Sequence, residues 1–463
     1  MIPLSLAEVA AATGGRLDGV PDSGRAVTGA VVVDSRLAAA GSLFVALAGE
    51  RVDGHDYAAA AVRAGAVAVL AQRPMGVPAV VVPDVVAALG RLARAVLDRR
   101  AATGGLRVVG ITGSSGKTGT KDLLAALLAP LGETVAPAGS FNNEIGLPLT
   151  VCRLGPGTRF LVLEYSARGL GHIAALSEIA PPGVAVELNV GTAHLGRFGT
   201  RAAVAAAKAE LVAALPSTGV AVLNADDPRT LAMGRETAAR VVTFGRAADA
   251  EVRATDVRLD GSGRPAFTLR TAVGAVPVHL AQYGEHLVSN SLAAAAVALE
   301  FGATPVEVAT GLAAARPASR WRMEVTRTPA GVTVVNDAYN ANPESMRAAL
   351  HALAAMSVGR RSWAVLGEMA ELGPAAAAEH ARIGRLAAEL GVGRLVVVGA
   401  AAAAITAGAA DEGLLATRVG DVEAAVALLR TQLAPGDVVL VKASRAVGLE
   451  RVAAGLLASA VPA

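Results

Sequence analysis

Cysteines, aromatic side chains and long apolar runs are all scarce in this sequence, and each scarcity excludes a class of protein. Cys152 is the only cysteine, so no disulfide can form within the chain, and we expect a reducing compartment, the cytoplasm. The aromatic content is 3% and the net charge is only +3, without any block of lysines and arginines, which argues against nucleic-acid binding. The longest uncharged run worth testing, residues 395–410, has 16 residues, fewer than the roughly 20 that a membrane-spanning helix needs. The first residues lack a basic region and carry Glu8, so we expect neither a signal peptide nor membrane insertion.

Apolar residues and glycines are abundant, and their distribution predicts an α/β protein with three domains. A chain of 463 residues exceeds what one hydrophobic core usually supports. Short β-branched runs alternate with Ala-rich helical stretches, which is typical of parallel sheets covered by helices. We expect a small mixed α/β domain over 1–84, a central parallel-sheet ATPase domain over 85–316 and a Rossmann-like domain over 317–463, where the strand pattern restarts.

The stretch "GITGSSGKTGTKD", residues 110–122, follows an apolar strand and precedes a helix. Backbone N–H groups at such a turn cradle phosphates, and a lysine adds a mobile positive charge. The strict P-loop pattern is not met, because Ile111 stands where its first glycine belongs. We expect Lys117 to reach the β- and γ-phosphates of ATP and the Thr118 hydroxyl to bind Mg²⁺. The residues expected at the nucleotide are Gly113, Ser114, Ser115, Gly116, Lys117, Thr118 and Gly119.

The altered loop, T-G-S-S-G-K-T, resembles that of the Mur ligases and folylpolyglutamate synthases, which form amide bonds through acyl-phosphates. The resemblance extends over nearly the whole chain. Its further motifs are "DSRLAAAGSLFVALAGERVDGHDY", "GSFNNEIGLPLT", "LNVGTAHLGRFGT", "AAAKAEL", "NADDP", "GEHLVSNSLAAA", "NDAYNANPESM", "LGEMAELG" and "VKASR". They resemble the Mur branch that adds D-alanyl-D-alanine to UDP-N-acetylmuramoyl-tripeptide, and the chain has no D-N-P-R motif of the diamino-acid-adding branches.

The resemblance implies a catalytic group that holds two Mg²⁺ ions. With Thr118 and Lys117 it comprises Glu164 at the end of a strand, His194 in a loop and Lys208 on an Ala-rich helix. In the family the position of Lys208 carries a carbamylated lysine, and an apolar setting would favour the neutral amine that this modification needs. The residues alone leave open a solvated carboxylate, an ordinary loop histidine and a solvated lysine.

Further nucleotide contacts are implied by resemblance only. His286 would lie near the nucleotide and Asn290 against the adenine, although Leu287 replaces the asparagine that commonly follows the histidine. Arg320 and Asp337 resemble third-domain residues that approach the γ-phosphate and the ribose once the domains close.

The substrate residues implied by the resemblance fall in all three segments. Ser35 and Arg36 resemble a uridine-diphosphate site, and Asn142 and Asn143 suit sugar and pyrophosphate contacts, although a strand-end turn explains the first pair equally well. The residues expected to face the incoming dipeptide are Asn340, Asn342, Glu368 and Glu371, with Lys442 or Arg445 holding its carboxylate. Helix capping and a charged first turn are the structural alternatives for "NAN" and "EMAEL".

One departure from the family pattern lies directly after Glu164. Tyr165 and Ser166 stand where relatives usually have a hydrophobic residue and a glycine. A glycine there permits close backbone approach, so we expect this change to reshape the metal side of the pocket.

The sequence therefore predicts a monomeric ATP-dependent ligase that couples D-alanyl-D-alanine to UDP-N-acetylmuramoyl-tripeptide. A paralogous amide ligase for another carboxylate and amine remains an alternative, as do a folate-type polyglutamylating enzyme and a non-catalytic nucleotide-binding regulator. Phosphate release with candidate substrates distinguishes these classes.

Overall fold

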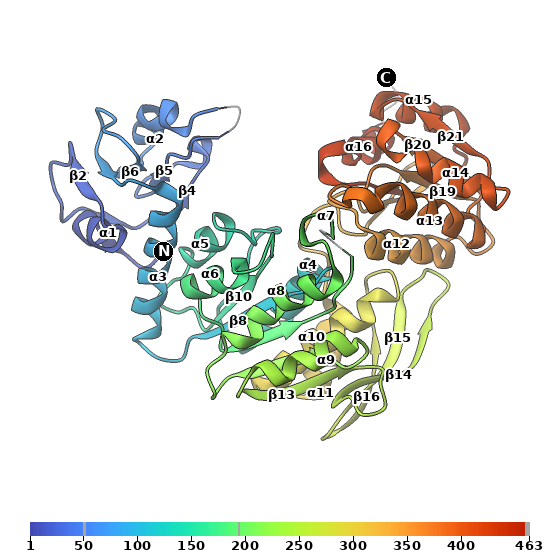
Figure 1. The fold of residues 1–463 in the computed structure, drawn as a ribbon, viewed down its shortest axis with the longest axis horizontal. Coiled ribbons are helices and arrows are strands. Elements are labelled where there is room, and N and C mark those ends of the chain that lie inside the picture. Colours follow the sequence, from blue (N-terminus) through green and yellow to red (C-terminus); the bar gives the residue numbers. More distant parts are fainter. Residues whose placement is uncertain (50–51, 193–194, 459–463) are drawn as a thin grey trace.

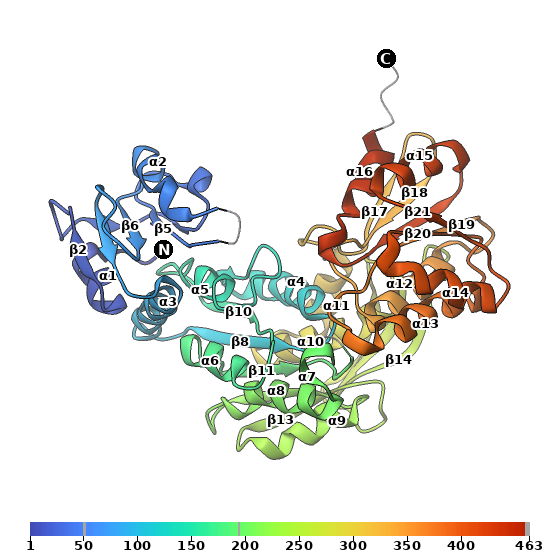
Figure 2. The same ribbon diagram turned by 45° about the horizontal axis from the view of Figure 1, so that its top comes forward.

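The computed structural model describes residues 1–49, 52–192 and 195–458 and arranges them around three separate large sheets (Figure 1). The N-terminal part and the C-terminal part lie on opposite sides of the central part (Figures 1 and 2). The predicted three-domain α/β architecture is confirmed. Within these ranges no helix is both long and apolar enough to cross a membrane.

The first sheet has five strands in the order β2-β7-β6-β5-β4, with β2 antiparallel and the others parallel. Their bounds are Arg16–Asp18, Ala79–Val81, Ala68–Ala71, Leu43–Val45 and Val31–Val32. Helices α1 (Leu6–Thr13) and α2 (Ala58–Arg63) accompany it, and β1 (Leu4–Ser5) pairs with β3 (Ala26–Val27). Ser5 and Glu8 form a capping box that fixes the start of α1.

Helix α3 (Val85–Ala101) connects the first sheet to the central part and packs against both α1 and α5 (Gly146–Val151). It begins at Asp84, whose carboxylate accepts hydrogen bonds from the backbone N–H groups of Val86 and Ala87. We propose the first domain boundary at this cap and the second after residue 316, beyond the last helix that covers the central sheet.

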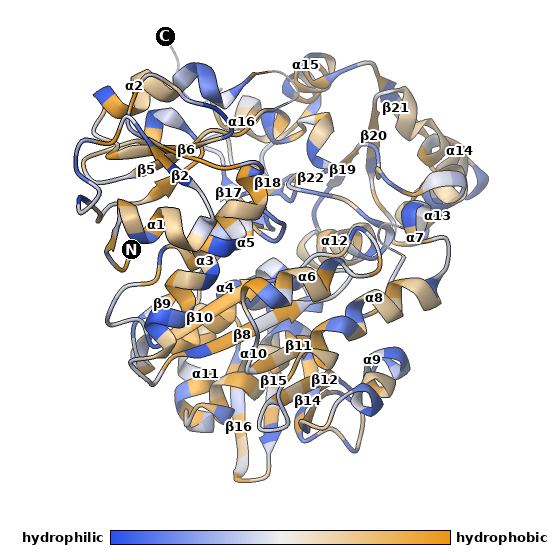
Figure 3. Ribbon diagram, turned by 60° about the vertical axis from the view of Figure 1, so that its left-hand side comes forward, coloured by the Kyte–Doolittle hydropathy of each residue, from blue (hydrophilic) through white to orange (hydrophobic). Residues whose placement is uncertain are grey.

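The central sheet has nine strands in the order β16-β15-β14-β13-β12-β11-β8-β10-β9. Their bounds in that order are Gly274–His279, Pro265–Thr271, Val252–Leu259, Arg240–Gly245, Val220–Asn224, Val184–Glu187, Arg107–Thr112, Phe160–Glu164 and Thr134–Val135. The strands β8 to β14 run parallel, whereas β15 and β16 form an antiparallel edge, so the sheet is mostly parallel as predicted. Figure 3 shows the apolar colouring of the buried strands around β8.

Helices cover both faces of this sheet. On one face lie α4 (Lys117–Leu128), α10 (His286–Glu300) and α11 (Pro305–Ala314), and on the other α3, α5, α6 (His172–Ile179) and α8 (Arg201–Ala213). The carboxyl ends of parallel strands meet at one edge of a sheet, where ligands bind in such folds. Glu164 pairs with Ile111 and Glu187 with Thr112 in the ladder, so the two carboxylates end the strands on either side of β8 and point to opposite faces of the sheet.

The C-terminal sheet has six strands in the order β17-β18-β22-β19-β20-β21, with only β17 antiparallel. Their bounds are Glu324–Arg327, Thr333–Asn336, Val438–Lys442, Ser362–Leu366, Arg394–Val398 and Ala416–Val419. Helices α12 (Pro343–Met356), α13 (Ala376–Glu389) and α14 (Ala403–Asp411) cover one face, and α15 (Val422–Gln432) and α16 (Glu450–Ala458) the other. The short helix α9 (Pro228–Ala232) packs against β12. The short helix α7 (Leu195–Phe198) packs against α8 and against Gly373–Ala375 of the C-terminal part.

Candidate active site

The predicted phosphate loop lies between β8 and α4, and the chain around it leaves little room for side chains. Gly116 has φ 87°, and a Cβ there would lie 2.6 Å from Asn290 Oδ1, so only glycine fits without strain. Asn189 holds the loop from the neighbouring strand, because its backbone oxygen accepts from Ser114 N–H at 3.0 Å and its Oδ1 accepts from Ser115 N–H at 3.0 Å. Asn189 was not predicted as a site residue, although it lies inside the quoted motif "LNVGTAHLG".

Lys117 is the first residue of α4 and lies over the loop. Its Nζ donates a hydrogen bond to the Gly113 carbonyl at 2.6 Å. Desolvation lowers the pKa of Lys117, Arg322 lowers it further, and Glu164 opposes both. An anion at the helix N-terminus would restore the charge of this ammonium group.

Thr118 and Glu164 meet at the same edge. Thr118 Oγ1 donates to Glu164 Oε2 at 3.3 Å, and Asn142 Nδ2 donates to the same oxygen at 3.3 Å. Glu164 Oε1 is buried and has no hydrogen-bond partner among the described residues, and burial raises the pKa of this carboxyl group. A hydroxyl and a carboxylate with an unused oxygen fit Mg²⁺, which prefers oxygen ligands.

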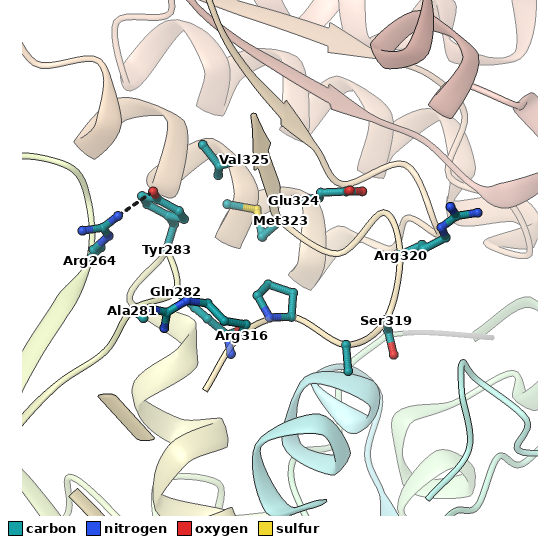
Figure 4. A pocket seen from close by; sticks show the side chains of 12 residues that line it. Arg264, Ala281, Gln282, Tyr283, Arg316, Ser319, Arg320, Met323, Glu324 and Val325 are labelled. Carbon is teal, nitrogen blue, oxygen red and sulfur yellow. Dashed lines mark hydrogen bonds between the residues drawn. The ribbon is translucent and has the colours of Figure 1, made fainter. Parts of the chain in front are cut away.

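Arg322, not Arg320, lies at the phosphate loop. Its Nη2 donates to Thr118 Oγ1 at 3.3 Å and to Ser140 Oγ at 3.1 Å, and its guanidinium lies 4.2 Å from the centre of the Tyr339 ring. Arg320 instead lines a separate cavity of about 360 Å³ beside the linker (Figure 4). We therefore propose to reassign the role expected for Arg320 at the γ-phosphate to Arg322.

A cavity of about 430 Å³ joins the phosphate loop to the C-terminal domain. Many predicted residues line it, from both domains. They are Ser114, Ser115, Gly116, Lys117, Thr118, Gly119, Asn142, Asn143, Glu164, Asn340, Asn342, Glu371 and Arg445.

Two of these asparagines also carry structural hydrogen bonds. Asn143 Oδ1 accepts from Gly146 N–H at 2.8 Å and thereby supports the start of α5. Asn342 caps α12 through Ser345 N–H, while its Nδ2 donates across the domains to the Ser114 carbonyl at 3.2 Å. The capping alternative expected for "NAN" is therefore realised at Asn342, and both residues still line the cavity.

Lys208 lies on α8 and is 5% exposed. It borders a small cavity together with Gly113, Lys117 and Phe198. Burial lowers its pKa to about 7, Lys117 lowers it as well, and Glu187 opposes the shift. The predicted ligand His194 lies outside the described residues, and among those described no three His, Cys, Asp or Glu residues gather as a metal cluster.

Glu187 is a buried carboxyl group that sequence reasoning missed. It is 0% exposed, and within the part of the chain that the structure describes neither of its oxygens has a hydrogen-bond partner. Burial raises its pKa well above the usual range, and Lys208 and Lys117 only partly oppose this shift. The sole sequence signal is a glutamate directly after the apolar strand residues "VAV" in "GVAVELNVG".

The nucleotide residues predicted beyond the loop occupy two places. Asn290 lies against the loop, with its amide beside Gly116 and Gly119. His286 lines a cavity of about 400 Å³ that also contains His351 from α12, and desolvation lowers the pKa of His286.

Lys442 does not line the main cavity, because it is buried in an ion pair. Its Nζ lies 2.6 Å from Asp337 Oδ2 and also donates to the Asn340 carbonyl at 2.9 Å. The predicted contact of Lys442 with the dipeptide carboxylate is therefore not supported, whereas Arg445 lines the cavity and lies 4.1 Å from the centre of the Trp321 ring. Glu368 also lies outside that lining, and its carbonyl accepts from Ser444 N–H.

The first domain keeps Ser35 and Arg36 at its surface. They begin a short 3₁₀ helix, and Arg36 pairs with Asp34 at 2.6 Å. The strand-end turn is thus present, and neither residue lines the main cavity.

Tyr165 and Ser166, the two residues that depart from the family pattern, lie in different surroundings. Tyr165 is fully buried on the α8 face, and its hydroxyl donates to the Ala180 carbonyl. A Cβ on Gly110 would lie 2.9 Å from the Tyr165 ring, so the two residues fit as a pair. Only Ser166 faces the cavity.

Comparisons with known proteins agree with this arrangement. Three family models match: "Mur ligase family, catalytic domain" at residues 29–104, "Mur ligase middle domain" at 111–298 and "Mur ligase, glutamate ligase domain" at 321–445. The UDP-N-acetylmuramoyl-tripeptide–D-alanyl-D-alanine ligase of Mycobacterium tuberculosis (strain ATCC 25618 / H37Rv) is 53% identical, over 99% of this chain and 98% of its own.

Solved structures are similar over the same length. MurF from Acinetobacter baumannii has a TM-score of 0.86 at 32% identity, covering 98% of this chain and 99% of its own. A structure titled UDP-N-acetylmuramoylalanyl-D-glutamyl-2,6-diaminopimelate–D-alanyl-D-alanyl ligase, also from A. baumannii, has a TM-score of 0.83 at 32% identity and covers 98% of each chain. MurF from Thermotoga maritima in complex with ADP has a TM-score of 0.80 at 32% identity, covering 93% of this chain and 98% of its own.

Proposed function

The chain belongs to the Mur ligase family, and we propose that it joins D-alanyl-D-alanine to UDP-N-acetylmuramoyl-tripeptide. It is an ATP-dependent, ADP-forming ligase that makes an amide bond in peptidoglycan synthesis. The observation that carries this function is the cavity in which Lys117, Thr118 and Glu164 of the central domain face Asn340 and Arg445 of the C-terminal domain.

The reaction needs no side-chain nucleophile. A carboxylate oxygen of the tripeptide attacks the γ-phosphorus of ATP, and ADP leaves. The amine of the dipeptide then attacks the carbonyl carbon of the acyl-phosphate, loses a proton, and phosphate leaves as the amide forms. Positioning and charge stabilisation supply the catalysis, and closure of the domains excludes water that would hydrolyse the intermediate.

Each charged group at the loop has a task in this scheme. Lys117 holds the β- and γ-phosphates, and Arg322 offers a second cation to the transferred group from the C-terminal domain. Thr118 and Glu164 would hold Mg²⁺, which neutralises phosphate charge when bound. Arg445 holds the carboxylate of the dipeptide, and a nearby carboxylate or the departing phosphate accepts the proton of its amine.

Lys208 would carry a carbamate in this proposal. Its neutral amine adds CO₂ and releases a proton, which creates an anion beside the loop. The buried setting and a pKa of about 7 support this modification, because they maintain neutral amine at physiological pH. His194 and a second Mg²⁺ belong to the same proposal.

The first domain binds the UDP moiety, with Ser35 and Arg36 as candidate contacts, and the enzyme works as a cytoplasmic monomer. No interaction with nucleic acid is part of this function.

The test measures ADP and phosphate release by the purified chain with ATP, Mg²⁺ and UDP-N-acetylmuramoyl-tripeptide. We expect fast release and a product of the pentapeptide mass only with D-alanyl-D-alanine. Equal release with L-glutamate or a lone diamino acid would favour the paralogous ligase. No release with any acceptor, from a folded protein, would favour the nucleotide-binding regulator. Lys117→Ala, expected to lose roughly 10²–10³ in rate, serves as the inactive control.

A further inference from the structure

The next inference rests on the proposed function and concerns the third residue of the tripeptide. We propose that Glu144, Arg168 and His172 bind the free end of that residue's side chain. This group, the end-binding cluster, favours an end that carries both an ammonium and a carboxylate group, as in 2,6-diaminopimelate, over the single ammonium group of lysine.

The cluster lies at the main cavity. Arg168 and His172 line it together with Lys117 and Glu164. Glu144 lies between the two basic side chains, with Oε1 3.4 Å from Arg168 Nη1 and Oε2 3.4 Å from His172 Nε2. A substrate in this cavity therefore meets the Arg168 cation and the His172 imidazole outside the phosphate and metal positions, with the Glu144 carboxylate 3.4 Å from both side chains.

Two chain segments, residues 142–144 and 164–168, run side by side, and they set the distance between the end-binding cluster and the reacting position. Asn142 contacts Glu164 through its side chain and accepts from Ser166 N–H through its carbonyl at 3.1 Å. Two residues further along each segment, Glu144 meets Arg168. Two residues span at most roughly 7 Å of chain. The far stereocentre of 2,6-diaminopimelate is four carbon–carbon bonds from the near one, about 5–6 Å, so the free end reaches the cluster when the near carboxylate lies at Glu164.

The charges of the cluster match a zwitterionic end. Arg168 N–H donates to His172 Nδ1 at 3.1 Å, so a neutral His172 carries its proton on Nε2, facing Glu144. The side chains of Glu144 and Arg168 are 38% and 52% exposed, and their separation is long for an ion pair, so both retain donors and acceptors for a ligand. A carboxylate can pair with Arg168 while the adjacent ammonium group pairs with Glu144. The end of a lysine side chain carries only an ammonium group, which can pair with Glu144 but not with Arg168.

The loop that carries Arg168 is fixed before substrate binds. Glu210 on α8 accepts from Gly171 N–H at 2.6 Å and from Ala174 N–H at 3.0 Å, which anchors the start of α6. The hydrogen bond between Ser166 and Asn142 anchors its other end. A pre-ordered loop loses little entropy on binding, so Arg168 can contribute to specificity.

The experiment compares kcat/KM for the diaminopimelate-containing and the lysine-containing UDP-tripeptides. We expect the unaltered enzyme to prefer the former at least 10-fold. Arg168→Gln should lower kcat/KM for the diaminopimelate substrate roughly 10- to 100-fold, the loss of one charge-assisted contact, mainly through KM. The same variant should change the lysine substrate less than 3-fold, and Arg168→Lys should retain part of the preference.

Arg430→Gln, on the exposed surface of α15, is the matched control and should alter neither substrate. Circular dichroism and thermal unfolding verify that each variant is folded. Equal use of both tripeptides by the unaltered enzyme, a preference for lysine, or an equal loss on both substrates in Arg168→Gln would overturn the assignment. Inactivity of the unaltered enzyme with both tripeptides would instead contradict the proposed function itself.

Discussion

Replacing Arg322 by alanine tests the reassignment of the phosphate-side arginine. Arg322 reaches Thr118 and Ser140 with Nη2 and lies over the Tyr339 ring. Loss of one preorganised contact to transition-state charge costs about 2.7–4 kcal/mol, or roughly 10²–10³ in kcat. The folded state loses two hydroxyl contacts and one cation–π contact, together about 1–3 kcal/mol, so the protein should remain folded at 25 °C.

The matched control is Arg320→Ala, two residues away in the same linker. Arg320 lies in the cavity of Figure 4, outside the lining of the main cavity. We expect its kcat within about 2-fold of the unaltered enzyme, since surface substitutions usually change energies by less than 0.5 kcal/mol. Steady-state ADP release at saturating substrates measures both variants, with thermal unfolding as the folding check. A larger kcat loss in Arg320→Ala than in Arg322→Ala would refute the reassignment.

Substitutions at three further positions, Lys208, Glu344 and Gly110, test the roles of buried or crowded groups. In the unmodified protein, the lowered pKa of Lys208 means that only the unfolded chain holds its proton between pH 7 and 10.5, so the free energy of unfolding rises with pH there. Lys208→Met should remove that rise in denaturant titrations, and Lys208→Ala should lose ligase activity that acetate partly restores. Glu344→Gln weakens the hydrogen bonds, 2.8 and 2.9 Å, that Glu344 accepts from Thr192 N–H and Oγ1 across the domains. If these bonds position the C-terminal domain over the ATP site, Glu344→Gln should raise the KM for ATP several-fold. An unchanged KM would contradict this positioning role of Glu344. Gly110→Ala should lower stability by about 1–3 kcal/mol through overpacking, whereas Gly261→Ala, with open space around it, should leave the melting temperature nearly unchanged.

The parts of the site that depend on local chain geometry could be predicted from the sequence. The phosphate loop needs glycines and a lysine between a strand and a helix, and all of them stand within a few residues of one another. The position of Glu164 at the end of an apolar strand could be predicted in the same way, whereas its place beside the loop was implied only by the family resemblance. Such features need only the register of one element and its neighbour.

The choice between Arg320 and Arg322 could not be made in this way. Trp321 and Met323 both adopt positive φ, 58° and 48°, so the linker has no regular alternation that would tell which arginine faces the loop. The ion pair of Lys442 with Asp337 joins residues more than a hundred positions apart, and no spacing rule indicates it. Tyr165 was expected to reshape the pocket, but its ring faces Gly110 in the core.

The buried charges around the loop point to the same polyanionic ligand as the family does. Lys117 and Lys208 are both desolvated and both have lowered pKa values, while Glu164 and Glu187 are desolvated and have raised ones. The attraction between these ammonium and carboxyl groups therefore does not offset the free-energy cost of removing them from water. A bound polyphosphate lowers the energy of the two ammonium groups, and a cation beside Glu164 does the same for that carboxylate. A nucleotide anion and a metal cation bound side by side at this edge also attract each other, so each should strengthen the binding of the other.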